Sequence, residues 1–192
     1  PLEIDILDGS GDIAISGSSL FVANFYGNFI YRQELDTGES SIITNPAFDG
    51  SGGMTSDGST LWVSSKNNNS VIEIDLTDNT SHVISDPSFV GPAGMAVVGN
   101  TLYVANFDNN TLSLVDLGTR TVVGILASPE FTSPRGIGVD GDTLLVTNFE
   151  GDSIALVDTI SNEVTGSLTD PLFQQAGDAL VVGEDLYVTN FE

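Results

Sequence analysis

The sequence predicts an all-β fold, a β-propeller built of four-stranded antiparallel blades with about 42 residues per repeat. Three observations lead to this fold class. One short motif recurs at a fixed spacing, short β-rich runs alternate with turn residues, and no stretch sustains helical periodicity for ten residues. Such a period is typical of radial or linear β-repeats. The five copies of the motif begin, at spacings of 41, 41, 42 and 42 residues, at Leu20, Leu61, Leu102, Leu144 and Leu186.

Each repeat divides into four strands, which the third repeat shows most clearly. Its predicted strands cover residues 95–98, 101–107, 111–116 and about 120–127, and Gly, Asn, Asp and Thr residues separate them. Strands of this length, rich in valine, isoleucine, threonine and aromatic residues between turn residues, are the hairpin pattern. The first strands of the repeats are predicted to begin near Ile13, Met54, Met95, Ile137 and Ala179.

The second strand distinguishes a propeller from a sandwich and a solenoid. Leu102 and Val104 point to one face of this strand, and Tyr103 and Ala105 point to the other. A sandwich strand keeps one polar face, whereas a blade stacked between two other blades buries both faces. A β-solenoid also buries both faces, but its repeats are commonly shorter. The propeller is therefore the preferred prediction.

The fifth repeat ends at Glu192, directly after its second strand, so four full blades and a partial fifth are predicted. Residues 2–7 align with an outermost strand and place Leu7 where other repeats have phenylalanine. Either the ring has five blades, one of them defective, or the missing blades lie in sequence outside these residues, which we favour. The chain opens without methionine, as in a processed precursor or an excerpt. We therefore expect residues 1–192 to form a single β-propeller domain of a longer chain.

The sequence is strongly acidic, because it contains 27 acidic and four basic residues, which gives a net charge of −23. Such a surface repels nucleic-acid phosphates and anionic lipids, so neither is an expected partner. Two interpretations of the charge stay open, solubility in a salty or extracellular setting and a working surface for divalent cations. The chain has no cysteine, no signal-peptide pattern and no run of about 18 apolar residues that would span a bilayer.

Two sets of repeated residues are predicted to be structural. An asparagine at the end of a second strand can hold the hairpin turn through its neighbouring backbone groups. A phenylalanine in the loop before a first strand can fill the gap between blades, with a ring of ligand-stacking aromatics as the alternative. The sets are Asn24, Asn106, Asn148 and Asn190, and Phe48, Phe89, Phe131 and Phe173. Glu34, Asp75, Asp116 and Asp158 are expected to cap the turns after the third strands.

Charged residues that break the repeat pattern give the candidate ligand site. Asp12, Arg135 and Asp178 stand just before predicted first strands, where most repeats have small residues such as Gly52-Gly53. In a propeller this position lines the mouth of the central channel, so the three side chains are predicted to converge there. They are either ordinary solvated charges at loop ends or the site of a small ligand or cation.

The segment Tyr187-Val188-Thr189-Asn190 has near copies at residues 103–106 and 145–148 and resembles the YVTN-type β-propeller repeat, a relative of NHL repeats. Residues 153–158 and 162–164 are similar to the next two strands of that repeat, and residues 133–137 to the approach to its first strand. The resemblance covers essentially the whole chain and departs most at Ser65 and Lys66. It implies the fold strongly and the activity weakly, because propellers host many functions.

The residues favour a non-catalytic function. Related propellers include lyases and lactone hydrolases, which need imidazole or a caged metal, whereas the single histidine here, His82, is predicted in an outer strand. No cofactor is predicted; calcium is possible, although no loop has EF-hand spacing. We expect a secreted or cell-surface scaffold that binds a protein or glycan or self-associates. The alternative is a calcium-dependent hydrolase or lyase of the gluconolactonase-like type.

Overall fold

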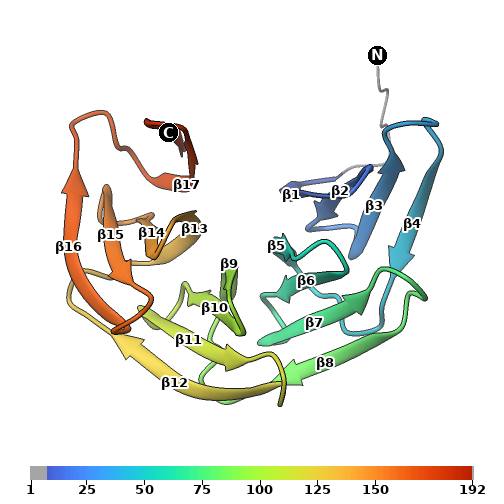
Figure 1. Cartoon of the computed structure of the whole chain (residues 1–192), viewed down its shortest axis with the longest axis horizontal. Coiled ribbons are helices and arrows are strands. Elements are labelled where there is room, and N and C mark those ends of the chain that lie inside the picture. Colours follow the sequence, from blue (N-terminus) through green and yellow to red (C-terminus); the bar gives the residue numbers. More distant parts are fainter. Residues whose placement is uncertain (1–7, 192) are drawn as a thin grey trace. The chain divides into compact units, whose positions relative to one another are not determined.

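The computed structural model describes residues 8–191, and every regular element in that range is a β-strand (Figure 1). Eighteen strands form four four-stranded antiparallel sheets and one two-stranded sheet, which confirms the all-β prediction and the four-stranded repeat. The predicted outermost strand at residues 2–7 lies outside the described residues. No helix long and apolar enough to cross a membrane occurs between residues 8 and 191.

The first compact unit, Pro1–Ser85, contains two of the four-stranded sheets. In both sheets the strands follow one another in sequence order. They are β1 (Ser10–Ser16), β2 (Ser19–Asn24), β3 (Phe29–Glu34) and β4 (Ser40–Thr44), then β5 (Ser51–Ser56), β6 (Thr60–Ser65), β7 (Ser70–Asp75) and β8 (Ser81–Ser85). One core joins the two sheets, with Phe21, Ile30, Leu61 and Ile72 at 0% exposure.

The second compact unit, Asp86–Glu192, contains two four-stranded sheets and the two-stranded one. Its strands are β9 (Pro92–Val98), β10 (Thr101–Asn106), β11 (Thr111–Asp116) and β12 (Thr121–Ala127); β13 (Pro134–Asp140), β14 (Thr143–Asn148), β15 (Ser153–Asp158) and β16 (Glu163–Thr169); and β17 (Ala176–Val182) and β18 (Asp185–Asn190). A core of side chains from both four-stranded sheets includes Leu112, Leu144 and Val157.

The second strands of the four-stranded sheets are buried on both faces. Leu102, Val104, Leu144 and Val146 all have 0% exposed surface, as do Leu61 and Val63. On the opposite face of β10, Tyr103 and Ala105 are 2% and 0% exposed. In β14 the two faces belong to separate cores, Leu144 and Val146 to one and Leu145 to the other. The prediction that these strands bury both faces is confirmed.

The first strands begin three residues earlier than predicted, because each opens with a β-bulge. In β1, Ser10 pairs with Asn24 and Ile13 with Val22, so the first strand carries one extra residue between these pairs. The same shift occurs in β5, β9, β13 and β17. The small and charged residues expected just before the first strands therefore lie within them, at the bulges.

Glycine at a bulge lets first strands approach closely. A Cβ added to Gly136 of β13 would lie 2.7 Å from the Cα of Asp178 in β17, and one added to Gly94 of β9 would lie 2.8 Å from the Cα of Gly136. Real side chains do not make such contacts, so these positions require glycine. The sequence pattern singled out these residues but placed them before the first strands, because it gave no sign of the extra residue in each strand.

Aspartates cap the turns after three of the third strands, as predicted. Asp116 Oδ1 accepts hydrogen bonds from the amide and the hydroxyl of Thr119 at 2.7 and 2.9 Å, and Asp158 binds Ser161 in the same way. These hydrogen bonds, the backbone one foremost, lower the pKa of both carboxyl groups. Glu34 differs, because it accepts from the Ser19 hydroxyl and forms an ion pair with Arg32 at 2.7 Å.

Candidate functional site

The repeated asparagines fasten the end of each second strand to the chain around it. Asn24 accepts a hydrogen bond from the amide of Gly27 in its own turn at 2.8 Å, as predicted. The other three accept from a backbone amide 16 residues earlier, in the loop before the first strand of the same repeat. These donors are Val90 for Asn106 at 3.3 Å, Thr132 for Asn148 at 3.0 Å and Gln174 for Asn190 at 3.1 Å.

Ser65 performs the same task in the repeat that departs from the motif. Its hydroxyl accepts from the amide of Asp49, again 16 residues earlier, at 2.9 Å and donates to the carbonyl of Ala47 at 2.8 Å. A hydroxyl offers both a donor and an acceptor, so it replaces the asparagine amide at this position. The sequence alone showed a departure here, whereas the structure shows an equivalent contact.

Three of the repeated phenylalanines lie in the cores. Phe48, Phe89 and Phe131 have 4%, 1% and 2% exposed surface, and Phe173 is half-buried beside Leu145 and Ile154. Rings this deeply buried have no face left for a ligand. Their positions fit a packing role rather than a ring of ligand-stacking aromatics.

Arg135 lies against two aromatic rings of the second unit. Its guanidinium carbon is 4.0 Å from the centroid of the Phe191 ring and 5.1 Å from that of Phe149. Phe149 also contacts Phe107 and Phe191, with ring centroids 5.7 and 5.8 Å apart, so three successive repeats contribute to one row of rings. Cation–π attraction and stacking on these rings hold the guanidinium in place.

No hydrogen bond or ion pair engages the Arg135 side chain within residues 8–191, although the residue is half-buried. Desolvation lowers its pKa, and the negative charge of Asp178 opposes this shift. The guanidinium stays charged at neutral pH, because its ordinary pKa lies far above 7. A partly desolvated cation is therefore held on a largely acidic protein with its donor groups available.

Asp178 lies at the bulge of β17, against Gly136, the residue that follows Arg135. Its Oδ1 accepts the amide of Ala179 at 2.9 Å, and no donor within the described residues reaches its Oδ2. The side chain is exposed, but the closely packed first strands beside it desolvate the carboxylate and raise its pKa; the Ala179 amide and Arg135 act in the opposite direction. Arg135 and Asp178 attract each other without forming an ion pair.

Asp12 belongs to the first unit and has a structural contact there. Its Oδ1 accepts the amide of Ile13, and its Oδ2 accepts the amide of Met54 in the neighbouring strand β5, both at 2.7 Å. The carboxylate therefore links the first strands of two sheets. Arg135 and Asp178 lie side by side in the second unit, and the convergence of all three residues stays a prediction.

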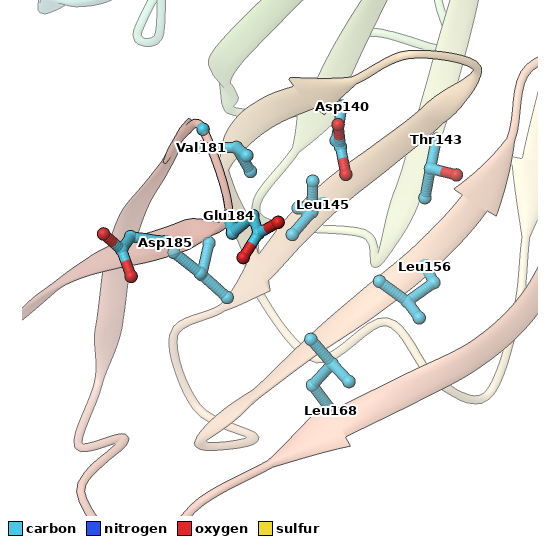
Figure 2. A pocket seen from close by; sticks show the side chains of 10 residues that line it. Asp140, Thr143, Leu145, Leu156, Leu168, Val181, Glu184 and Asp185 are labelled. Carbon is cyan, nitrogen blue, oxygen red and sulfur yellow. The ribbon is translucent and has the colours of Figure 1, made fainter.

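A shallow pocket of about 320 Å³ lies in the second unit, where strands β14 to β16 meet the turn between β17 and β18 (Figure 2). Leu145, Leu156 and Leu168 form its apolar floor, and Asp140 and Glu184 stand among its polar residues. His82 is exposed in the outer strand β8, as predicted. Between residues 8 and 191, no three histidine, aspartate or glutamate side chains gather as a metal site.

No family model matches the sequence, and no curated protein matches it. Solved structures do match the fold. The catalytically inactive histidine-to-alanine variant of virginiamycin B lyase from Staphylococcus aureus, solved with quinupristin, is 20% identical, with a TM-score of 0.81 over 94% of this chain and 63% of that one. The nidogen/laminin complex is 16% identical, with a TM-score of 0.82 over 94% and 72%.

A third similar structure is hydrazine synthase of Kuenenia stuttgartiensis, which is 22% identical with a TM-score of 0.75 over 91% of this chain. The chain spans only 52% of that protein and 62% of selenomethionine-substituted virginiamycin B lyase. These likenesses place the chain in the β-propeller fold class. They include a lyase and a propeller found in a protein complex, so the fold by itself assigns no activity.

Proposed function

We propose that the chain is part of a non-catalytic, secreted or cell-surface β-propeller that acts as a binding scaffold and holds a carboxylate group of its partner at Arg135. In this proposal residues 1–192 supply four complete blades and a partial fifth of the YVTN type. The observation that carries the proposal is the guanidinium of Arg135, stacked on Phe191 and Phe149 with no hydrogen-bond partner within the described residues.

Stacking explains why this arginine suits recognition. A guanidinium on an aromatic ring uses its flat face, and its N–H donors point outward in its plane, where they match the two oxygens of a carboxylate. The two rings restrict the rotamers of the long side chain, so less conformational entropy is lost on binding. The largely acidic surface disfavours multiply charged anions, and a single carboxylate suits one arginine.

The similar structures include a protein complex, which fits a binding scaffold, and a lyase, which fits the alternative of an enzyme. One of them is a complex of nidogen with laminin, and another is a lyase whose inactive variant lacks a histidine. The only imidazole of this chain is His82, in the outer strand β8. The acidic surface supports a secreted or cell-surface location, because salt screens the self-repulsion there. The alternative is a calcium-dependent hydrolase or lyase.

Side-chain NMR tests the proposal directly, because the chain has only three arginines, Arg32, Arg120 and Arg135. Titration with acetate at about 0.15 M salt should shift the Arg135 Nε–H signal saturably and leave the other two in place. Arg135→Gln should weaken acetate binding about tenfold, the effect of one charge-assisted bidentate contact. Arg120→Gln removes the same charge from an exposed turn and is the matched control.

An unshifted Arg135 signal, or equal shifts at all three arginines, would contradict the proposed carboxylate site. The proposal also predicts that the protein has no catalytic activity that depends on His82, so the substitution His82→Ala should abolish none. A lactonase or lyase activity lost in that variant would favour the alternative, because it would give the single imidazole a catalytic role.

A further inference from the structure

Tyr26 breaks the repeat pattern in the turn between β2 and β3. It stands two positions after Asn24, and the other four-stranded repeats have a polar residue at this position, namely Asn67, Asp108 and Glu150. The first repeat has a tyrosine instead, and 71% of its surface is exposed. An aromatic ring at a surface position that otherwise carries polar groups suits contact with a ligand.

The exposure of Tyr26 does not depend on the absence of a preceding blade. Asn67 holds the same position one repeat later, where a complete sheet precedes it. A Cβ added to Gly50 would lie 2.9 Å from Nδ2 of Asn67 and 3.2 Å from Cζ of Phe25, which belongs to the preceding sheet's turn. Asn28 of that turn also accepts the amide of Gly50. Asn67 is exposed despite these neighbours, so this position stays at the surface when a blade precedes it.

The ring of Tyr26 is supported on one side by its own repeat. Gly9 has φ +65°, and a Cβ there would overlap Cδ2 of the ring, so only glycine lets the ring lie at this place. Phe25 packs against Tyr26 edge to face, with ring centroids 5.2 Å apart and an angle of 84° between the planes. A ring supported in this way loses little conformational freedom when a ligand binds.

Two amide side chains with open hydrogen-bonding capacity stand beside the rings. Oδ1 of Asn28 accepts the amide of Gly50, and Nδ2 of Asn67 donates to Oδ1 of Asp49, both at 2.9 Å. Nδ2 of Asn28 and Oδ1 of Asn67 have no hydrogen-bond partner within residues 8–191, and both side chains are exposed. One free donor and one free acceptor therefore lie on either side of Gly50.

We propose that the Tyr26 cluster, formed by Phe25, Tyr26, Asn28 and Asn67, binds a hexopyranose residue of a neutral glycan. One face of such a sugar carries axial C–H groups, which the negative face of an aromatic ring attracts, and hydroxyl groups around its rim match the two amides. The net charge of −23 disfavours acidic sugars. The cluster belongs to the first unit, so this inference stands whether or not a carboxylate binds at Arg135.

Titration with neutral methyl glycosides tests this inference. The probes are methyl glucopyranoside, methyl galactopyranoside and methyl mannopyranoside, and the NMR signals of the Tyr26 ring protons report stacking. At least one of the three should shift these signals saturably, with a dissociation constant in the millimolar range. Irradiation of the aromatic protons of the protein should transfer saturation most strongly to the protons on one face of the bound sugar.

Variants separate stacking from hydrogen bonding, with saturation transfer as the readout. Tyr26→Ala should weaken binding about tenfold, the effect of one stacked ring, whereas Tyr26→Phe keeps the ring and should bind within about twofold of the parent. Asn28→Asp keeps the acceptor for Gly50, loses the amide donor and should weaken binding about fivefold. The matched controls are Tyr187→Ala for an exposed tyrosine and Asn109→Asp for the added charge in an exposed turn, both in the second unit. Circular dichroism confirms that each variant is folded.

Each contrary outcome overturns a stated part of the inference. If none of the three glycosides shifts the Tyr26 signals, or if Tyr26→Ala binds them as well as the parent, the sugar site is overturned. If methyl glucuronide binds more tightly than methyl glucopyranoside, the assignment to a neutral glycan is overturned. If N-acetyl-tetraproline amide shifts the Tyr26 signals and the glycosides do not, the ring binds a proline-rich segment instead. An unshifted Arg135 signal with acetate bears on the proposed function alone.

Discussion

Strands β14 and β18 have nearly the same sequence and very different surroundings. Leu144 and Val146 of β14 are completely buried, whereas Leu186 and Tyr187 of β18 have 36% and 59% exposed surface. Strand β14 lies between β13 and β15, whereas β17 is the one strand that pairs with β18 among the described residues. The recurring motif therefore supplies side chains fit for burial, and the neighbouring strands determine whether they are buried.

The same difference extends to the sheet next to β18. Leu114 of β11 is 8% exposed, because side chains of β15 and β16 pack over it. Its counterpart one repeat later, Leu156 of β15, lines the open pocket together with Leu168 (Figure 2). Within residues 8–191 only the two strands β17 and β18 stand beside these leucines, and their turn forms the other wall of the pocket.

The largest contrast is expected from placing a charge in each strand. Val146→Asp buries a carboxylate without a partner and removes packing, and should lower the free energy of unfolding by about 4 kcal/mol. Val188→Asp changes the matching, partly exposed position of β18 and should cost less than about 1 kcal/mol. Urea denaturation of both variants measures the difference. Equal losses would mean that β18 is covered in solution.

A smaller difference in stability is expected between two of the repeated asparagines at the ends of the second strands. Asn148 is fully buried and bonds Thr132, Glu130 and Ser153, whereas Asn190 is exposed and bonds Gln174. Asn148→Ala leaves buried backbone groups unsatisfied and should cost about 2 kcal/mol. Asn190→Ala should cost less than about 1 kcal/mol, since water replaces its bonds. Denaturation midpoints of the two variants test this, and a larger loss at Asn190 would contradict the contrast.

The sequence was sufficient for the strand order, the antiparallel hairpins and the doubly buried second strands, because these follow from local periodicity. The bulges were not predictable, since an extra residue changes the pairing across strands without changing the alternation along one strand. The amide partners of Asn106 and Asn148 were also hidden, because they lie 16 residues away, in a different loop.

At the candidate site, the break in the repeat pattern identified Arg135 and Asp178, but not their contacts. The phenylalanine that follows each asparagine was visible in the sequence, and only the structure shows that Phe149 and Phe191 hold Arg135. The contact between Asp12 and Met54 joins two repeats, and a pattern within one repeat does not show it.

The smallest expected effect concerns two aspartates of neighbouring sheets, Asp158 and Asp178, whose pKa values are shifted in opposite directions. Hydrogen bonds from Ser161 lower the pKa of Asp158 in the folded state. The stability that they contribute is therefore present above the unfolded pKa and is lost as pH falls through the lower folded pKa. The pKa of Asp178 is raised by desolvation, so the folded state keeps its proton to higher pH. Stability therefore falls as pH rises from the unfolded pKa of this group through its folded pKa.

Urea denaturation midpoints measured between about pH 2 and pH 7 cover the pH ranges in which both aspartates titrate. Asp158→Asn should lower the free energy of unfolding mainly above the pH range in which Asp158 titrates. Asp178→Asn should raise the free energy of unfolding above the pH range in which Asp178 titrates. Asp142→Asn removes an exposed carboxylate of the same unit and is the control for net charge. A destabilised Asp178→Asn protein at neutral pH would mean that its bond to Ala179 and its attraction to Arg135 outweigh desolvation.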